Sequence, residues 1–155
     1  MIDSSAVYSD TVRIHAPAAF VWAILTDFEN YEKWNAFCPS IKTRLELGAP
    51  VEMMTDLGSG LQPQVEYMSR IEAPNVIAWS MENRPEDPIH ACRTQFINAV
   101  SDDCCLYVSI DDFGGPGMAG MLAHFGKAVE DGFNRCAYGL KDYAEKQYAA
   151  KNSSQ

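Results

Sequence analysis

The sequence has little positive charge and no long apolar run. Its 155 residues contain 12 Lys and Arg against 21 Asp and Glu, which gives a net charge of −9 and a pI near 4.7. A surface this acidic repels nucleic-acid phosphates and anionic lipid headgroups, so we expect no nucleic-acid partner. No apolar run approaches the length that crosses a bilayer, and the first residues do not form a secretion signal. We therefore expect a cytoplasmic protein without membrane insertion.

Motifs for several chemistries are also absent. The chain has no Gly-x-Ser-x-Gly nucleophile elbow and no dinucleotide-binding glycine fingerprint. Its histidines, His15, His90 and His124, have no second ligand at helical or strand spacing, so we expect no metal site. The five cysteines lack the spacing of a disulfide framework and are expected to be reduced; they are Cys38, Cys92, Cys104, Cys105 and Cys136. The sequence therefore predicts a protein without a cofactor.

The composition is that of one folded domain. The apolar share is 47% and the charged share 21%, close to the averages of globular proteins. A chain of this length can bury a sizeable core. We expect a single domain over residues 1–150 and a frayed tail over residues 151–155, where the sequence reads Lys-Asn-Ser-Ser-Gln.

The most informative stretch runs from Pro17 to Ile41. Pro17 suits the first position of a helix, and apolar residues follow at three- and four-residue spacing, at Phe20, Val21, Ile24 and Leu25. Residues 27–30 interrupt this pattern. Aromatic residues then recur every three positions, at Tyr31, Trp34 and Phe37, until Cys38-Pro39 ends any helix. The stretch predicts two short helices with a corner between them.

The run I-x-A-P-x-x-x-V-W-x-x-L-T-D-F-x-x-Y-x-x-W-N-x-F extends from Ile14 to Phe37. With its surroundings, residues 7–41, it resembles the polyketide cyclase/dehydrase and lipid-transport superfamily, also called START-like. The resemblance implies a helix-grip fold with an internal cavity. It leaves the chemistry open, because the superfamily binds and converts many unrelated molecules.

The rest of the chain predicts strands and then one long helix. Residues 6–14 alternate as a half-buried strand does, and six further strands are expected near 41–47, 50–57, 64–72, 75–82, 90–100 and 104–113. From Met118 to Tyr143 apolar residues recur three or four apart, which predicts a helix whose glycines indicate a bend or a close approach. The fold class is therefore α+β, with a curved antiparallel sheet of about seven strands around a long C-terminal helix.

A curved sheet cannot fill its own concavity with one helix, so we expect an apolar ligand site between the two. Flat rings and pliable methionines suit a hydrophobic, aromatic or polycyclic ligand. The candidate ligand-binding residues are Trp34, Phe37, Trp79, Met118, Met121, Leu122 and Phe125. For each of them alone, ordinary core packing is the alternative.

Three polar residues are candidates for chemistry in such a cavity. His90 begins a strand after a Pro-rich loop and could exchange a proton near neutral pH, although a rim histidine is the alternative. Tyr67 could donate a hydrogen bond to a ligand carbonyl, or be an ordinary buried tyrosine. Of the consecutive Asp111 and Asp112 only one can face inward, and Asp112 is our candidate; a solvated pair is the alternative.

The two faces of the strand at 90–100 decide which of its side chains reach the cavity. Phe96 favours a buried face that includes His90 and leaves Arg93 outside. Ile97 favours the reverse. A slip of one residue would exchange the two faces.

Three functions follow from this interpretation. The first is a polyketide cyclase-like enzyme, a lyase or isomerase that promotes aldol closure and dehydration with His90 as the proton shuttle and Tyr67 as a donor to the enolate. The second is a carrier that sequesters the same hydrophobic ligand without turnover. The third is an interaction module whose concave surface holds a protein partner. We expect a monomer or a homodimer.

Overall fold

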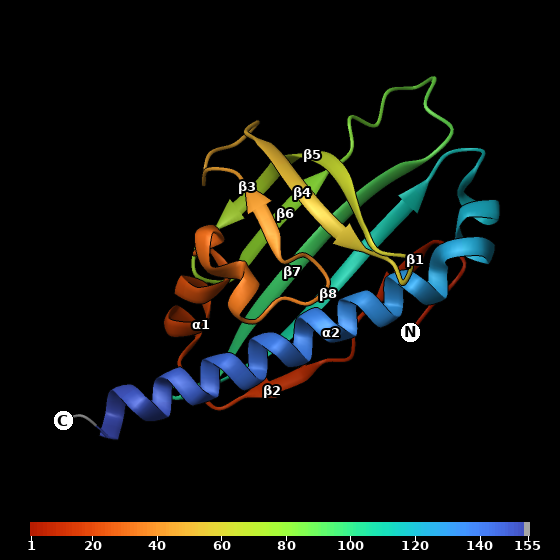
Figure 1. Cartoon of the computed structure of the whole chain (residues 1–155). Helices are drawn as coiled ribbons and strands as arrows, with labels where there is room; N and C mark the ends of the chain where they lie inside the picture. The colour runs from red at the N-terminus through yellow and green to blue at the C-terminus, as the bar shows by residue number, and fades with distance from the viewer. Residues whose placement is uncertain (154–155) are drawn as a thin grey trace.

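The computed structural model describes residues 1–153, which form one antiparallel sheet curved around one long helix (Figure 1). The chain begins with β1 (Ala6–Tyr8), β2 (Val12–Ile14), α1 (Ala18–Leu25) and the 3-10 helix η1 (Phe28–Lys33). Six strands follow: β3 (Ser40–Lys42), β4 (Pro50–Asp56), β5 (Leu61–Glu72), β6 (Val76–Ser80), β7 (His90–Ser101) and β8 (Cys104–Gly114). The helix α2 (Met118–Ser153) completes the helix-grip fold that the sequence predicts.

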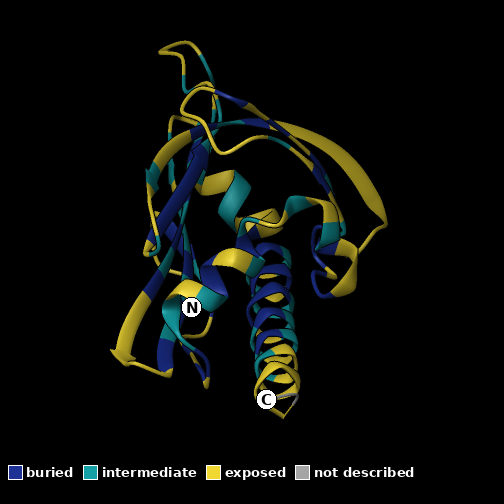
Figure 2. Ribbon diagram, turned by 90° about the vertical axis from the view of Figure 1, so that its left-hand side faces the viewer, coloured by how far each residue is buried: buried dark blue, intermediate teal, exposed yellow. Residues whose placement is uncertain are grey.

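The sheet has the order β1-β8-β7-β6-β5-β4-β3, and β2 also pairs with β8. Consecutive strands from β3 to β8 are neighbours, as the short turns between them require. Figure 2 shows the sheet bent so that it arches over α2, which lies on its inner side. The register places Arg93 of β7 beside Trp79 of β6 and beside Asp111 of β8. Since directly paired residues point to the same side of a sheet, these three side chains share the concave face.

The strands at the two edges of the fold are shorter than the sequence predicts. A single strand is expected over residues 6–14, but Ser9 and Asp10 interrupt it. Ser9 Oγ accepts a hydrogen bond from the Ser109 amide at 2.9 Å, and the Asp10 amide donates to Asn134 Oδ1 of α2 at 2.7 Å. These side-chain contacts replace the regular ladder and turn the chain between β1 and β2. The strand expected at 41–47 ends at Lys42.

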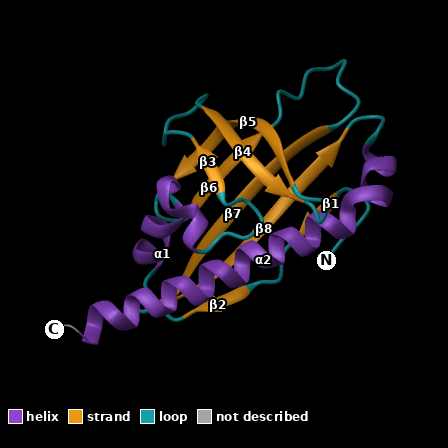
Figure 3. Cartoon of the chain, viewed as in Figure 1, coloured by secondary structure: helices purple, strands orange, loops and turns teal. Residues whose placement is uncertain are grey.

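Helix α2 runs along the side of the sheet formed by β8, β1 and β2 and contacts these strands (Figure 3). Two of its glycines permit the close approach to other elements that their presence in a helix indicates. A Cβ at Gly132 would overlap the ring of Phe37, and a Cβ at Gly139 would overlap the carbonyl oxygen of Trp34. The helix continues to Ser153, so residues 151–153 are helical where the sequence predicts a frayed tail. The rest of that tail, residues 154–155, lies outside the described residues.

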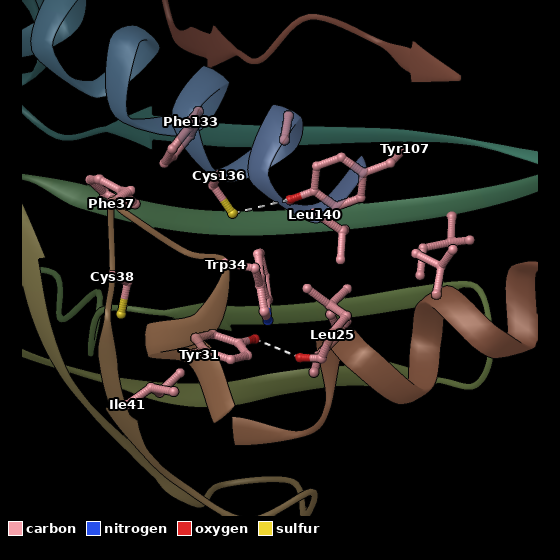
Figure 4. Packing of buried hydrophobic residues seen from close by; sticks show 14 of the residues in the cluster. Leu25, Tyr31, Trp34, Phe37, Cys38, Ile41, Tyr107, Phe133, Cys136 and Leu140 are labelled. Atoms are coloured by element: carbon pink, nitrogen blue, oxygen red, sulfur yellow. Dashed lines mark hydrogen bonds between the residues drawn. The ribbon is translucent and has the colours of Figure 1, made fainter. Parts of the chain in front are cut away.

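The core is continuous where α2 meets α1 and η1 (Figure 4). Side chains from α2, from β8 and from the corner after α1 fill this region; they include Leu25, Tyr31, Trp34, Tyr107, Phe133, Cys136 and Leu140. The hydroxyl of Tyr31 donates to the carbonyl oxygen of Leu25 at 2.5 Å, which holds η1 against the end of α1. In the described part of the chain, no helix is both long and apolar enough to span a membrane.

Candidate functional site

A cavity of about 260 Å³ lies between the concave face of the sheet and the first half of α2. Strands β4 to β8 supply one side of it, and α2 supplies the other. The lining residues are Phe37, Met53, Thr55, Leu57, Gln64, Glu66, Trp79, Met81, Ile89, Ala91, Arg93, Asp111, Phe113, Met121, Phe125, Val129 and Phe133. The sequence prediction of a gap between sheet and helix therefore has a counterpart in the structure.

Most of this lining is apolar. Phe37, Trp79 and Phe133 are buried and surround the deep end, whereas Phe125 is 53% exposed and lies with Met121 at the mouth. The strands contribute every second residue to this wall, and α2 contributes residues four apart. The arrangement produces a pocket with aromatic walls that opens to solvent beside the first turns of α2.

A permanently charged residue lies at the deep end of the cavity. Arg93 is 5% exposed, and its guanidinium carbon lies 4.3 Å from the ring centroid of Phe133, 5.6 Å from that of Phe37 and 5.9 Å from that of Trp79. These are cation–π distances. The Nε atom donates to Ser109 Oγ at 2.8 Å. A guanidinium keeps its charge in a protein, so the apolar cavity contains one fixed positive charge.

Two acidic residues face the same cavity, and we call Glu66 and Asp111 the cavity carboxyls. Burial, assisted by the negative charge of Asp111 and opposed by Arg93, raises the pKa of Glu66 to about 8. Burial also raises the pKa of Asp111 to about 7, against the effect of Arg93 and with a smaller contribution from Asp112. Near neutral pH, both carboxyls can therefore exchange protons.

The cavity carboxyls differ in their hydrogen bonds. Glu66 Oε2 accepts from Gln64 Nε2 at 3.0 Å, and Gln64 Oε1 accepts from Thr55 Oγ1 at 3.3 Å, so this carboxyl is held by a short chain across β4 and β5. In contrast, Asp111 Oδ1 is buried and has no hydrogen-bond partner among residues 1–153. An unpaired buried acceptor is costly, which makes Asp111 the more available of the two for a ligand.

Behind Arg93 lies a second polar cluster, whose polar groups contact one another and not the cavity. The hydroxyl of Tyr107 donates to Gln95 Oε1 at 2.6 Å and lies 3.8 Å from Cys136 Sγ, as Figure 4 shows for the tyrosine and the cysteine. Arg93 Nη2 lies 3.6 Å from the same sulfur. Ser109 and Cys136 therefore hold the guanidinium, and Tyr107 contacts Cys136 behind it.

Four of the seven predicted ligand-binding residues lie in the cavity lining; they are Phe37, Trp79, Met121 and Phe125. The other three do not. Trp34 is buried in the neighbouring core, with its ring centroid 4.8 Å from that of Tyr31. Leu122 packs against the core from the side of α2, and Met118 precedes the turns that border the cavity.

The three predicted catalytic residues lie outside the cavity. His90 is half-buried at the start of β7, and its Nε2 lies 2.7 Å from the carbonyl oxygen of Arg84 in the preceding loop. Tyr67 is half-buried on the outer face of β5. Asp112 is exposed, because strand alternation turns Asp111 inward in its place.

The expected faces of the strand at 90–100 are wrong. Ala91, Arg93, Gln95 and Ile97 are buried on the concave side, whereas His90, Cys92, Thr94 and Phe96 are only half-buried on the other. The aromatic residue was the misleading signal, since the outer face of this strand accepts an apolar ring. The aromatic contacts and the hydroxyl of Ser109 stabilise the guanidinium inside.

The sequence prediction therefore missed the polar residues of the site, Arg93 and Glu66, and placed Asp112 where Asp111 lies. The alternation of inward and outward residues along β5 and β7 contains a signal that indicates these two residues. Arg93 shares its face with Ile97, and Glu66 shares its face with Met68, a buried methionine. A charged residue in phase with buried apolar neighbours indicates a site within a core.

Within residues 1–153, no three His, Cys, Asp or Glu side chains are arranged so that they could hold a metal ion. All five cysteines are free thiols, and burial raises the pKa of Cys38 to about 12 and that of Cys105 to about 11. These two thiols are therefore protonated at neutral pH and are not nucleophiles.

Residues 5–145 match the family described as Polyketide cyclase / dehydrase and lipid transport. The chain belongs to this family. No curated protein matches the sequence. The family resemblance of residues 7–41 is therefore confirmed over most of the chain.

Solved structures share the fold of this polyketide cyclase/dehydrase and lipid-transport family protein. The ZhuI aromatase/cyclase from Streptomyces sp. R1128 is 20% identical, with a TM-score of 0.71 over 92% of this chain and 94% of that one. Norcoclaurine synthase from Thalictrum flavum is 9% identical, with a TM-score of 0.67 over 92% and 95% of the two chains. A START superfamily protein from Mycobacterium smegmatis is 15% identical, with a TM-score of 0.60 over 88% and 99%. At these identities the similarity establishes the fold.

Proposed function

We propose that the cavity binds one hydrophobic aromatic molecule and promotes its cyclisation and dehydration without a cofactor. The observation that carries this proposal is the fixed charge of Arg93 beside two protonatable carboxyls, Glu66 and Asp111, in an otherwise apolar cavity. A cavity that only stores an apolar ligand gains nothing from a buried guanidinium, which costs stability. Family membership, and the fold shared with a protein described as an aromatase/cyclase, support the same function.

The volume of the cavity limits the substrate. An apolar cavity of about 150 Å³ holds benzene, so a cavity of about 260 Å³ accommodates one to two rings. A longer molecule would extend through the mouth beside Met121 and Phe125. We therefore propose a substrate that carries several carbonyl groups and closes one ring at the deep end.

The first half of the reaction would form a carbon–carbon bond. The carboxylate of Asp111 removes a proton from a carbon next to a carbonyl, and the electron pair moves to the carbonyl oxygen, which becomes an enolate beside Arg93. The enolate carbon attacks a second carbonyl of the same molecule. The new alkoxide oxygen takes a proton from Glu66, which leaves a hydroxyl group on the closed ring.

The second half would remove water and restore the enzyme. Glu66, now ionised, removes a second proton from the carbon between the carbonyl and the new hydroxyl. The hydroxyl leaves as water with the proton that Asp111 took in the first half. One carbon–carbon bond forms, one water is lost, and both carboxyls return to their starting states without an oxidant or a reductant.

The pKa values of the cavity carboxyls suit these roles. With a pKa of about 7, Asp111 is substantially ionised at neutral pH and serves as the base. With a pKa of about 8, Glu66 is mostly protonated and serves as the acid. The contacts assign the two roles: Asp111 Oδ1 has no partner among residues 1–153 and is free to take a proton, whereas Glu66 Oε2 already accepts a hydrogen bond from Gln64. Neither His90 nor Tyr67 is required.

The test is turnover of a phenyl-substituted diketone that closes to a six-membered cyclic enone. The enone is followed by its ultraviolet absorbance and the lost water by mass spectrometry. We expect Asp111→Asn to lower the rate by about 100-fold or more, as loss of a general base does. The matched control is Asp112→Asn, one residue away on the outer face, which keeps the wild-type rate.

Two results would redirect the proposal. Equal rates for Asp111→Asn and the wild type would remove the catalytic assignment. Binding of the diketone without conversion, detected by quenching of the fluorescence of Trp79 in the cavity wall, would favour the carrier function instead.

A further inference from the structure

We propose that the natural ligand carries a free carboxylate that binds Arg93, so that the cavity selects a one- or two-ring aromatic acid. The inference rests on the proposed function, because it uses the same cavity and adds the class of compound. It describes how the acid is held when Asp111 is protonated; the enolate step proposed above uses the same guanidinium with Asp111 ionised, and the two states do not occur at once.

Arg93 has hydrogen-bonding capacity that the described residues do not use. A guanidinium has five N–H donors. In the described residues, Arg93 donates to Ser109 Oγ at 2.8 Å and to Cys136 Sγ at 3.6 Å, and its other close contacts are aromatic rings. The remaining donors have no oxygen acceptor from this part of the protein. A carboxylate fits them, because it accepts two parallel N–H bonds from one guanidinium.

The charge of Arg93 is also unbalanced within the described residues. Arg93 forms no ion pair with any carboxylate of residues 1–153, although Asp111 is its direct neighbour across β8. Glu66 is also nearby, but Oε2 accepts its hydrogen bond from Gln64. A buried cation without a counter-ion is rare in proteins. A ligand anion would supply the missing charge.

The protonation states of the ionisable groups around Arg93 agree with a bound ligand carboxylate. Burial raises the pKa of Glu66 to about 8 and that of Asp111 to about 7, so below these values neither repels an anion. The other ionisable groups near the guanidinium are Tyr31 on η1, Tyr107 on β8, Cys38 after η1 and Cys136 on α2. Burial raises the pKa of Tyr31 well above its ordinary value, so its hydroxyl remains neutral. Burial raises the pKa of Tyr107 well above its ordinary value and that of Cys38 to about 12, so both remain neutral.

The orphaned oxygen of Asp111 adds a second contact. When this carboxyl is protonated, it can donate its proton to one ligand oxygen while Arg93 donates to both. The carboxylate would then lie at the deep end, and its ring would lie between Phe113 and Phe125 toward the mouth. A neutral amide of the same shape presents only one acceptor oxygen to these donors.

The experiment compares naphthalene carboxylate with naphthalene carboxamide, which have the same shape and differ in charge. Binding is measured by isothermal titration calorimetry at about pH 6, where the cavity carboxyls are protonated. We expect the acid to bind about 10- to 100-fold tighter, as a charge-assisted bond to a buried guanidinium allows. We expect Arg93→Gln to abolish the preference. The wild-type comparison needs no variant and remains informative if Arg93→Gln does not fold.

A second arm uses pH. Near pH 9 both cavity carboxyls are ionised and repel the bound acid, so its affinity should fall by at least about 10-fold while that of the amide stays constant. Asp111→Asn should reduce this fall. Equal affinities of acid and amide at about pH 6, or no binding of either, would overturn the inference. Preference for the acid without turnover of any diketone would leave the inference standing and would remove only the cyclase function.

Discussion

The buried carboxyl of Glu66 should make the free energy of unfolding of this protein fall as pH rises. Glu66 is 7% exposed, and burial raises the pKa of its carboxyl from the ordinary 4.5 to about 8. A raised acid pKa means that the folded state holds its proton more tightly than the unfolded state does. The contribution of protonated Glu66 to the free energy of unfolding is therefore complete below about pH 4.5, and it is lost as pH rises through about 8.

The size of this effect follows from the two pKa values. The interval from 4.5 to about 8, at about 1.4 kcal/mol per pH unit, corresponds to on the order of 5 kcal/mol. This is an upper limit, because water in the open cavity stabilises the ionised form. Since a domain is typically stable by about 5–15 kcal/mol, the loss should be large enough to measure. Glu66→Gln keeps the shape of the side chain and removes the proton equilibrium.

The assay is urea unfolding followed by tryptophan fluorescence at about pH 5.5, 7 and 8.5. We expect the free energy of unfolding of the wild type to fall across this range by several kcal/mol more than that of Glu66→Gln. The matched control is Glu52→Gln on the exposed face of β4, which should follow the wild type. Parallel pH profiles for Glu66→Gln and the wild type would refute the reasoning, because they would show that this carboxyl is not buried with a raised pKa.

Three further predictions concern the rate and the packing of α2. The rate of cyclisation should rise with pH through about 7, as the base ionises, and fall through about 8, as the acid loses its proton; a pH–rate profile without these two limbs would contradict the assignment. Arg93→Lys should lower kcat by about 100-fold or more, because a point charge does not reproduce a planar fork, whereas His90→Ala should keep the wild-type kcat in the same assay. Gly139→Ala should destabilise the fold by about 2 kcal/mol or more in urea unfolding, since its Cβ would overlap the carbonyl oxygen of Trp34. Gly120→Ala, in open space on the same helix, should be neutral or slightly stabilising.

The fold could be predicted because each element carries its own periodic signal. The apolar stripe of α2 and the turn residues between strands are local features, and the helix-grip architecture follows from their order. The break in the first strand could not be predicted in this way. It depends on Ser9 and Asp10 bonding to Ser109 and Asn134, which are 100 and 124 residues distant in sequence.

The site was harder to predict than the fold because it depends on which way single side chains point. The apolar wall was partly found, since Phe37 and Trp79 are conspicuous in the sequence and line the cavity. The charged residues were not. On β7 the faces differ by one residue, and Phe96 outweighed Ile97 in the prediction although only Ile97 is fully buried. Arg93 was consequently placed in solvent.

The two buried polar clusters of this protein differ in whether their polar groups have hydrogen-bond partners. We assign the fully paired cluster to the stability of the fold and the other to function. Tyr107 and Gln95 are almost completely buried and satisfy one another through a 2.6 Å hydrogen bond, so their contribution is to fix the core. Arg93 and Asp111 lie side by side on adjacent strands without an ion pair between them, and one oxygen of Asp111 has no partner in the described chain. Side chains that served stability alone would have been replaced by apolar residues at little cost. The unpaired donors of Arg93 and the unpaired oxygen of Asp111 can bind a ligand at the deep end of the cavity. We therefore place the function in the cavity and not in the Tyr107–Gln95 cluster behind it.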